Sequence, residues 1–326
     1  MLQVFINEGG RLIRTRWTEG TPLPGATVWV DLLNPTADEV AAAERCLGQR
    51  LPTRAQMAEI EDSSRLRPGA ESLHMTVLAL VWADTDQPKL APVSLVLAGG
   101  RLATIHHIDP QPFLTFRRKT THRGFAPARA DAVMTALLEA LIERTANVLR
   151  RVGIELEAMG QRAFHRGTPG RTAPPRDDGR TLRRLGQAGQ LVAKAHESLS
   201  SLHRILDFFA RGSGDALLGK DARRWSRGAA LDTKGLYEYA QFLASKVRLL
   251  LETTLGQINV EQNEIVKILS VASVGLFPPT LIASLCGMNF VSEPGRHWAF
   301  GYPLAMLAII ASALVPMWYF RRKRWM

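Results

Sequence analysis

Residues 268–286 read ILSVASVGLFPPTLIASLC, and residues 298–320 read WAFGYPLAMLAIIASALVPMWYF. Neither stretch contains a charged residue, and their lengths of about 19 and about 23 residues match the roughly 20 that an α-helix needs to cross a bilayer. The connection between them, residues 287–297, is too short for a domain, so the two helices form a hairpin whose free ends lie on the same side. The sequence therefore predicts two membrane spans near the C-terminus.

Basic residues set the orientation of this hairpin. Lys267 precedes the first span. Four cations follow the second span: Arg321, Arg322, Lys323 and Arg324. Because positive charge beside membrane spans stays in the cytoplasm, we expect a multi-pass protein of the cell (inner) membrane with both termini cytoplasmic and residues 287–297 facing outward. The beginning of the chain, MLQVFINE, does not resemble a secretory signal. The basic tail, residues 321–326, is expected to ring the inner mouth of the hairpin or to meet anionic lipid headgroups.

The composition limits the classes of function. The chain has 326 residues, of which 46% are hydrophobic, and this excludes a disordered protein. Its net charge of +11 would suit nucleic acid binding. The basic residues concentrate, however, in the tail and between Arg162 and Arg184, so no nucleic acid partner is expected. We find no nucleophile–base cluster, metal-ligand spacing or Gly-rich phosphate loop, and we therefore expect neither enzymatic activity nor a cofactor.

The part of the chain before the spans is predicted to be an α+β cytosolic domain, a mixed sheet flanked by helices, over residues 1–230. Short runs of β-forming residues alternate with turn signals such as Gly9-Gly10 and Gly99-Gly100. The predicted strands are residues 1–6, 11–17, 27–33, 72–82, 93–98 and 101–107. The predicted helices are residues 36–47, 129–162 and 181–210, with an exposed loop over residues 167–179.

A further helical pattern begins near Leu231, and no stop signal interrupts it before the first span. Roughly 50 residues of unbroken helix would extend about 80 Å, far more than an ordinary globular helix. We interpret residues 231–267 as a very long cytosolic stalk helix that is continuous with the first span.

The tripeptide Gly287-Met288-Asn289 at the end of the first span is the most informative motif. The stretch WAFGYP begins the second span at Trp298. Together with EQNEIVKI at residues 261–268, PPT at residues 278–280 and the closing YFRRKRW, this arrangement resembles the CorA family of magnesium and cobalt transporters. The resemblance spans most of the chain, with weaker similarity in the first domain, for example at WVDL in residues 29–32.

The resemblance implies a funnel-shaped homopentamer in which the first span of each subunit lines a central pore. It also implies that the Asn289 side chains form a ring at the outer mouth and hold a hydrated divalent cation. A ring of neutral amides suits Mg²⁺, which gives up its inner water shell reluctantly. The implied activity is an influx of Mg²⁺, and of Co²⁺ or Ni²⁺, driven by the membrane potential and gated by cytosolic Mg²⁺.

The resemblance also transfers the pore-lining positions to one face of the first span and of the helix before it. These positions are Asn263, Val266, Leu269, Ser273, Phe277, Thr280 and Ser284. Their spacing of three or four residues fits one helical stripe. Rings of Leu269 or Phe277 would close a pore by excluding water. The alternative is that these two side chains face lipid or the second span.

The sequence departs from the family in the outer loop and beside it. Relatives carry an acidic MPEL motif where this chain has SEPG, so that Glu293 is the remaining carboxylate, offset by Arg296, and slower cation capture is expected. Cys286 stands where many relatives have tyrosine. Family members also have regulatory metal sites in the cytosolic funnel. The candidate ligands here are Asp84, Asp86 and Asp232, against the alternative that they are solvated surface carboxylates.

Two other functions remain open. The first is a proton-coupled zinc importer of the ZntB subgroup, which shares the GMN motif, although Phe290 and the WAFGYP stretch look more like magnesium-type members. The second is a membrane-tethered sensor or scaffold without transport, which would need no polar positions along one face of a span. The histidines show no metal-binding spacing, and His106, His107, His196 and His203 are predicted to lie at the surface or at interfaces.

Overall fold

The computed structural model describes residues 1–59, 66–69, 71–123, 125–126, 128–164, 178–212, 217–288 and 300–323. The chain divides into two compact units, Met1–Leu251 and Glu252–Met326. The strands are β1 (Leu2–Glu8), β2 (Arg11–Thr15), β3 (Thr27–Leu33), β4 (Leu66–Pro68), β5 (Ser72–Val81), β6 (Lys89–Ala98) and β7 (Arg101–His106). The helices are α1 (Ala37–Leu47), α2 (Arg54–Met57), α4 (Gln111–Arg123), α5 (Ala130–Phe164), α6 (Asp178–Ala210), α7 (Lys220–Cys286) and α8 (Gly301–Arg322).

The first unit is built on a seven-stranded mixed sheet with the order β2-β1-β3-β7-β6-β5-β4. Strands β3 and β7 are parallel, and the other paired strands are antiparallel. A two-residue turn joins β6 to β7 through Gly99 and Gly100, whose positive φ angles of 55° and 71° suit a tight hairpin that only glycine adopts without strain. The central strands are buried on both faces, as the apolar run TVWVDLL of β3 predicts.

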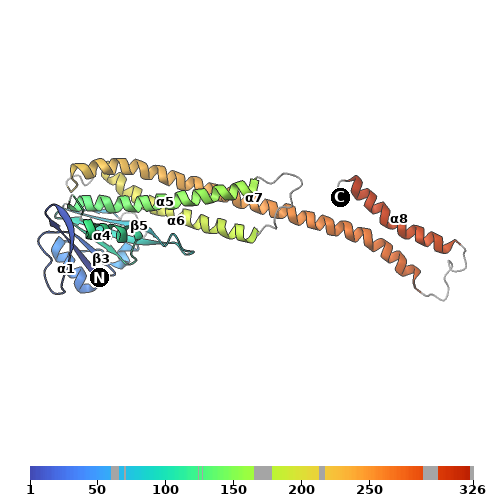
Figure 1. The fold of residues 1–326 in the computed structure, drawn as a ribbon, viewed down its shortest axis with the longest axis horizontal. Helices are drawn as coiled ribbons and strands as arrows, with labels where there is room; N and C mark the ends of the chain where they lie inside the picture. The colour runs from blue at the N-terminus through green and yellow to red at the C-terminus, as the bar shows by residue number, and fades with distance from the viewer. Residues whose placement is uncertain are drawn as a thin grey trace. The chain divides into compact units, whose positions relative to one another are not determined.

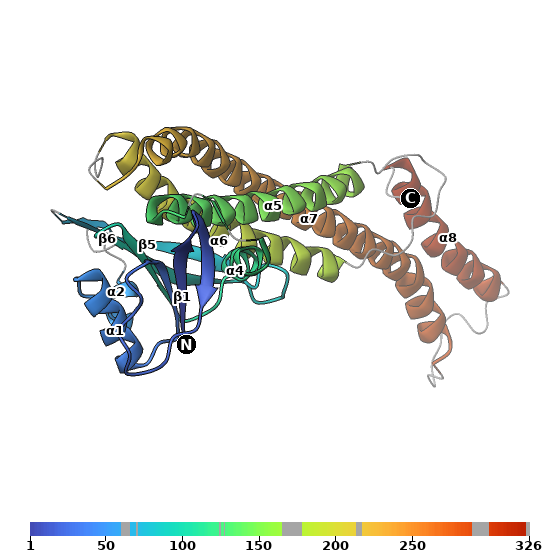
Figure 2. The ribbon, with the colours of Figure 1, turned by 60° about the vertical axis from the view of Figure 1, so that its left-hand side comes forward.

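Helices cover both faces of this sheet (Figure 2). Val30 and Leu32 point from β3 toward α1 and α2, and pack with Ala43, Leu47 and Met57. Trp29, on the opposite face, belongs to a larger core that includes residues of α4, α5, α6 and the beginning of α7. Helix α1 begins with a capping box in which Thr36 and Glu39 bond to each other's backbone N–H groups.

Beyond the sheet, α5, α6 and the first part of α7 lie side by side (Figure 1). Their shared core contains Leu149, Val192 and Leu243, one residue from each helix, all at most 1% exposed. Gly153 of α5 allows a close approach of α7, because a Cβ atom at this position would collide with the Tyr239 hydroxyl. The first unit is therefore an α+β domain extended by a three-helix bundle, and this confirms the predicted fold class.

Several predicted elements differ from the structure. Helix α4 and the short β4 and α2 were not predicted; in α4, only a few residues such as Phe113 and Phe116 are buried, among many polar ones. Strand β6 begins at Lys89 rather than at Val93, although Pro92 lies inside it. Proline is tolerated there because β7 pairs with β6 only from Val93 onward, so the other edge of this segment has no neighbouring strand.

Helix α7 begins at Lys220, earlier than the predicted start near Leu231. Its first turns bury small residues, Ala222, Ser226 and Ala229, rather than large apolar ones, so the hydrophobic periodicity is weak in the sequence. The Asp131 carboxylate accepts a hydrogen bond of 2.8 Å from the Gly219 backbone N–H, which fixes this end of the helix to α5. From there α7 continues through the expected stalk and first span to Cys286.

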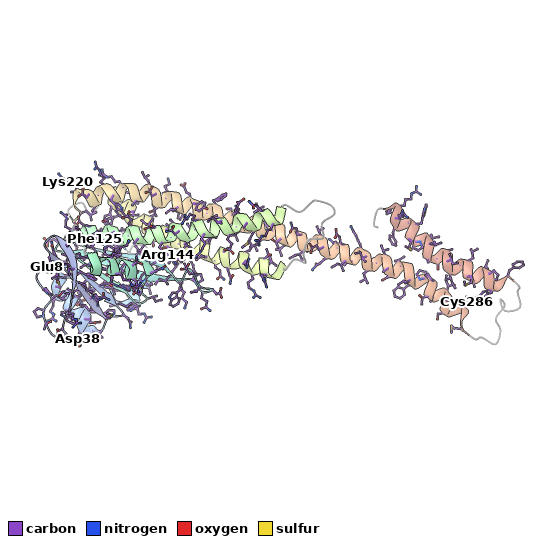
Figure 3. All side chains as sticks on the ribbon, viewed as in Figure 1. Glu8, Asp38, Phe125, Arg144, Lys220 and Cys286 are labelled. Carbon is purple, nitrogen blue, oxygen red and sulfur yellow. The ribbon has the colours of Figure 1, made fainter. Side chains whose placement is uncertain are left out.

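The second unit contains the rest of α7 and helix α8. Both helices have a stretch long and apolar enough to cross a membrane, and no residue of either stretch is buried. Helix α8 begins at Gly301 and ends at Arg322, close to the predicted second span; residues 298 and 299 lie outside the described residues. The side chains of α8 and of the last part of α7 project outward from their ribbons (Figure 3).

Candidate functional site

Helix α7 carries all seven predicted pore-lining residues without a break in the helix. At 100° per residue, these positions fall within an arc of about 120° around the helix axis. Leu269 and Phe277 are 66% and 72% exposed in the single chain, and Ser273 is half-buried. The remaining four are exposed: Asn263, Val266, Thr280 and Ser284. One face of the helix thus presents both polar and apolar side chains, and all of them except Ser273 are exposed in the single chain.

Two hydroxyl groups on this face bond to the helix itself. The Ser273 Oγ donates a hydrogen bond of 2.8 Å to the Leu269 carbonyl, and the Thr280 Oγ1 donates one of 2.7 Å to the Leu276 carbonyl. Each hydroxyl hydrogen is therefore directed at the backbone, while the oxygen keeps its lone pairs for another donor. Side chains held in this way act as hydrogen-bond acceptors.

Two prolines lie inside the apolar part of α7. Pro278 and Pro279 have no N–H group, so the carbonyls of Val274 and Gly275 lose their usual helical donors. The helix nevertheless continues to Cys286. Transmembrane helices tolerate such prolines when neighbouring helices, Ser or Thr side chains, ordered waters or a local change of helix geometry satisfy the freed carbonyls.

The helix ends immediately before the GMN motif. The Gly287 N–H donates to the Ala283 and Ser284 carbonyls at 3.0 and 3.2 Å, and the Met288 N–H donates to the Leu285 carbonyl at 3.4 Å. Gly287 does not adopt the left-handed conformation of a common helix C-cap. The other predicted residues of this region, Asn289 in the motif and Glu293 in the outer loop, lie outside the described residues.

The predicted basic residues lie before the first span and after the second span. Lys267 is exposed on α7, before its apolar stretch. At the end of α8, the Arg322 guanidinium lies 5.5 Å from the centre of the Trp318 ring, and the Lys323 ammonium lies 5.8 Å from that of Tyr319. Arg321 is exposed beside them, and Arg324 lies outside the described residues. Cations paired with aromatic rings at a span end are typical of a membrane–water interface.

The predicted regulatory carboxylates differ in their surroundings. Asp84 forms ion pairs with Arg144 and Arg151, and hydrogen bonds from these two guanidinium groups lower the pKa of its carboxyl. Asp86 accepts a 3.4 Å hydrogen bond from the Gln187 amide. Asp232 is exposed on α7.

Asp84 and Asp86 line a shared pocket of about 220 Å³, into which Arg151 and Arg184 also project. Within the described ranges, no group of three or more His, Cys, Asp or Glu side chains is placed to hold a metal ion. The charge of Asp84 is thus balanced by arginines, and a cation binding there would have to displace them.

The first unit contains a buried polar cluster that was not predicted from the sequence. His106 was predicted at the surface or an interface, but it is 0% exposed and lies 2.9 Å from Asp31. The prediction for His106 was wrong, because the strand β7 ends under α4 rather than at the surface. Asp31, inside the apolar strand β3, was the available signal, since a carboxylate in a buried strand requires partners.

An α+β domain followed by two exposed apolar helices, one of which carries polar side chains along one face, defines a membrane protein whose first apolar helix continues from the helix bundle of the first unit. The family model described as CorA-like Mg²⁺ transporter protein matches residues 24–322. The chain belongs to the CorA family.

Similar proteins cover the full chain. The sequence is 32% identical over 326 residues to the magnesium transport protein CorA of Escherichia coli strain K12, and 31% identical to that of Pectobacterium atrosepticum, with 100% of both chains covered in each case. The fold resembles the CorA magnesium transporter of Methanocaldococcus jannaschii, with a TM-score of 0.72, 16% identity and coverage of 100% and 99%. It also resembles the full-length CmaX protein, with a TM-score of 0.74, 19% identity and coverage of 100% and 98%.

Proposed function

We propose that this protein is a magnesium transporter that admits Mg²⁺, and also Co²⁺ or Ni²⁺, through a pore in the cell membrane. The observation that carries this proposal is the 32% identity to a magnesium transport protein along the full length of both chains. Both termini face the cytoplasm in this proposal, and the inside-negative potential drives entry, at about 2.3 kcal/mol per unit charge per 100 mV.

The pore is formed by several copies of the chain, because one hairpin of two helices cannot enclose a water-filled path. We take the assembly to be a homopentamer of the funnel type, with lipid around it and the α7 stripe facing the common axis. The exposure of Leu269 and Phe277 in the single chain supports this arrangement, since such apolar side chains need either lipid or a partner around them.

The polar positions of the stripe suit a hydrated ion. The waters around Mg²⁺ are hydrogen-bond donors, and Mg²⁺ keeps them because it loses its inner shell slowly. Ser273 and Thr280 offer acceptor oxygens, since their hydrogens are already committed to the backbone. Asn263 and Ser284 extend the polar positions along the same face. An ion would therefore pass these positions with its waters in place.

The apolar positions of the stripe provide the gate. In the assembly, the copies of Leu269 form one ring around the pore, and the copies of Phe277 and of Val266 form two others. Ions pass a ring only when water fills its centre. In the proposed closed state the side chains within each ring touch one another and exclude water. Mg²⁺ bound to cytosolic carboxylates favours that state; Asp86 and Asp232 are the candidates, and Asp84 joins them only if Arg144 and Arg151 withdraw.

Selection takes place at the outer mouth, where Gly287, Met288 and Asn289 form the filter and Glu293 attracts cations. At the inner mouth, Lys267 and the basic tail repel cations electrostatically and favour contact with anionic lipid headgroups. These roles rest on the family resemblance and on the position of the motif at the end of α7.

The test is ion uptake into proteoliposomes that contain a Mg²⁺-sensitive dye, with an inside-negative potential. Wild-type protein is expected to admit Mg²⁺, and Asn289→Ala is expected to reduce uptake about 100-fold, which corresponds to about 2.7 kcal/mol in the barrier. Ser312→Ala serves as the matched control, because the Ser312 hydroxyl lies on α8 and donates to the Ile309 carbonyl of the same helix.

The other outcomes would indicate a different function or refute the role of Asn289. Uptake of Zn²⁺ that requires an imposed proton gradient, without Mg²⁺ uptake, would replace the proposal with a zinc importer. No uptake of Mg²⁺, Co²⁺, Ni²⁺ or Zn²⁺ by well-folded protein would indicate a membrane-tethered scaffold. Equal loss in Asn289→Ala and Ser312→Ala would refute the special role of Asn289.

A further inference from the structure

The centre of the first unit contains ionisable groups that the transport proposal does not use. Asp31 lies in β3, and His106 lies at the end of β7, the strand parallel to β3. Both side chains are at most 1% exposed. Arg117 of α4 reaches into the same cluster and contacts Asp31 and Asp109. Since burying charge is costly unless the charges are paired, the protonation state of each group matters to the stability of the domain.

The Asp31 carboxylate accepts hydrogen bonds from three described side chains: Thr104, His106 and Arg117. The Trp29 indole N–H donates to the Thr104 hydroxyl at 2.9 Å, so that this hydroxyl directs its own hydrogen to Asp31 Oδ1 at 2.6 Å. His106 Nε2 lies 2.9 Å from the same oxygen, and Arg117 Nη1 lies 2.5 Å from Oδ2. Burial opposes ionisation of Asp31, but the hydrogen bond and charge of His106, with the charge of Arg117, hold its pKa below the ordinary value. Asp31 is therefore an ionised carboxylate.

Both ring nitrogens of His106 face atoms that can only accept. Nε2 faces the ionised Asp31, and Nδ1 lies 3.2 Å from the backbone carbonyl oxygen of Ile108. A neutral imidazole has one donor and one acceptor nitrogen, whereas the imidazolium has two donors. Only the imidazolium satisfies both contacts at once.

The charge count leads to the same conclusion. Three charged groups form the ion pairs described beside His106: Asp31 from β3, Asp109 from the segment before α4, and Arg117 from α4. These three sum to one negative charge. The ring of the adjacent His107 pairs with the Asn34 amide oxygen, 3.3 Å away. A positive charge on His106 balances the net negative charge of these three groups.

We propose that His106 is a proton-binding site of the cytosolic domain, occupied in the folded protein, and that the bound proton joins α4 to the two parallel strands. The imidazolium balances Asp31 and Asp109 together with Arg117. Without that proton, one ring nitrogen would face an acceptor with no hydrogen between them, and the cluster would carry an unbalanced negative charge under α4. This inference concerns the cytosolic domain alone and does not depend on the ion that the protein transports.

A double-variant cycle on the full-length protein in detergent tests the charge of His106. His106→Gln keeps one donor for Asp31 but has no charge, and we expect it to lower the melting temperature by roughly 5–10 °C. Asp109→Asn is expected to lower it as well, since the cluster then becomes positive. Combining the two restores neutrality, and the double variant should recover at least half of the loss seen in His106→Gln.

The matched control is Thr104→Val, which removes a hydrogen bond to Asp31 without changing any charge; adding Asp109→Asn to it should bring no recovery. Additive losses in the His106→Gln and Asp109→Asn pair would overturn the proposal, because a neutral His106 has no charge to compensate. If a single variant fails to fold, the double variant decides. A folded double variant would support a protonated His106, and an unfolded double variant would overturn the proposal.

Discussion

The unit Met1–Leu251 and the unit Glu252–Met326 contain the same kinds of apolar side chain and place them in opposite environments. In the first unit, Trp29 is completely buried and stacks on Phe5, with 4.2 Å between ring centres. In the second unit, Trp318 is 61% exposed. Of the described residues of the second unit, only Thr254 is buried. The first unit has a protein core, whereas the apolar side chains described in the second unit are mostly exposed in the single chain.

This difference in burial leads us to expect that the first unit contributes most of the stability and that the second unit carries conduction. A side chain in a packed core contributes to stability through the contacts that it loses on unfolding. A side chain on an exposed apolar helix has few such contacts within the chain. Changes in the first unit should therefore alter stability, and changes in the second unit should alter conduction.

The largest expected effect is a difference in stability between two Trp→Ala variants, one in each unit. Trp29→Ala should destabilise the protein by about 3–5 kcal/mol, because it removes a fully buried ring. Trp318→Ala should cost at most about 1 kcal/mol, through the loss of its contact with Arg322. Thermal unfolding of both variants in detergent measures the difference. Equal costs would show that Trp318 is packed against protein in the assembly.

Phe277→Ala should separate conduction from stability. Shortening a side chain at the proposed gate lets water enter the closed pore, and we expect the background Mg²⁺ leak to rise about tenfold, equivalent to about 1.4 kcal/mol in the barrier. The control is Ile282→Ala, since Ile282 lies on the opposite side of α7 from the stripe. Flux assays in proteoliposomes distinguish the two. A larger leak from Ile282→Ala would place the pore on another face.

Thr280→Val should reduce Mg²⁺ flux by about fivefold, because it removes one acceptor worth about 1 kcal/mol from the path of the hydrated ion. The substitution keeps the shape of the side chain. Thr280→Ser, which keeps the hydroxyl, should restore most of the flux. If valine and serine behave alike, the hydroxyl at this position has no contact with the ion.

The smallest expected effect is on the acid stability of the first unit. Burial opposes ionisation of Asp131, but hydrogen bonds from Arg129 and from the Gly219 N–H lower its pKa. A carboxyl whose pKa is lowered by folding stabilises the protein above the pKa of the unfolded chain, about 3.9, and this contribution is lost as the pH falls through the lower value. The contribution is at most about 1 kcal/mol, because Arg129 is largely exposed.

Asp131→Asn should therefore lower the melting temperature near pH 6 by a few degrees, and the difference from the wild type should shrink as the pH falls through the lowered pKa of Asp131. Melting curves from pH 3 to pH 7 measure this. Asp38→Asn, at the first turn of α1, is a control carboxylate of the same domain. A difference that does not shrink at all as the pH falls below the unfolded pKa of about 3.9 would mean that the Asp131 charge is not responsible.

The fold class, six strands and most of the long helices were predictable because their signals are local. Uncharged stretches gave the two apolar helices, and β-forming runs between turn glycines gave strands such as Thr27–Leu33, whose predicted and observed bounds agree. Helix α4 was missed because it contains few large apolar residues. The beginning of α7 was missed because alanine and serine fill its buried face. The pore stripe came from the family resemblance, and its role remains a prediction.

The sequence by itself determined the alternation of buried and exposed residues, the apolar spans and the place of the GMN motif at the end of the first span, since each depends on neighbouring residues. Tertiary structure alone decided the pairing of Asp84 with Arg144 and Arg151, and the meeting of Asp31, His106 and Arg117. These partners lie far apart in the chain, and only the parallel pairing of β3 with β7 and the packing of helices against the sheet bring them within hydrogen-bond distance.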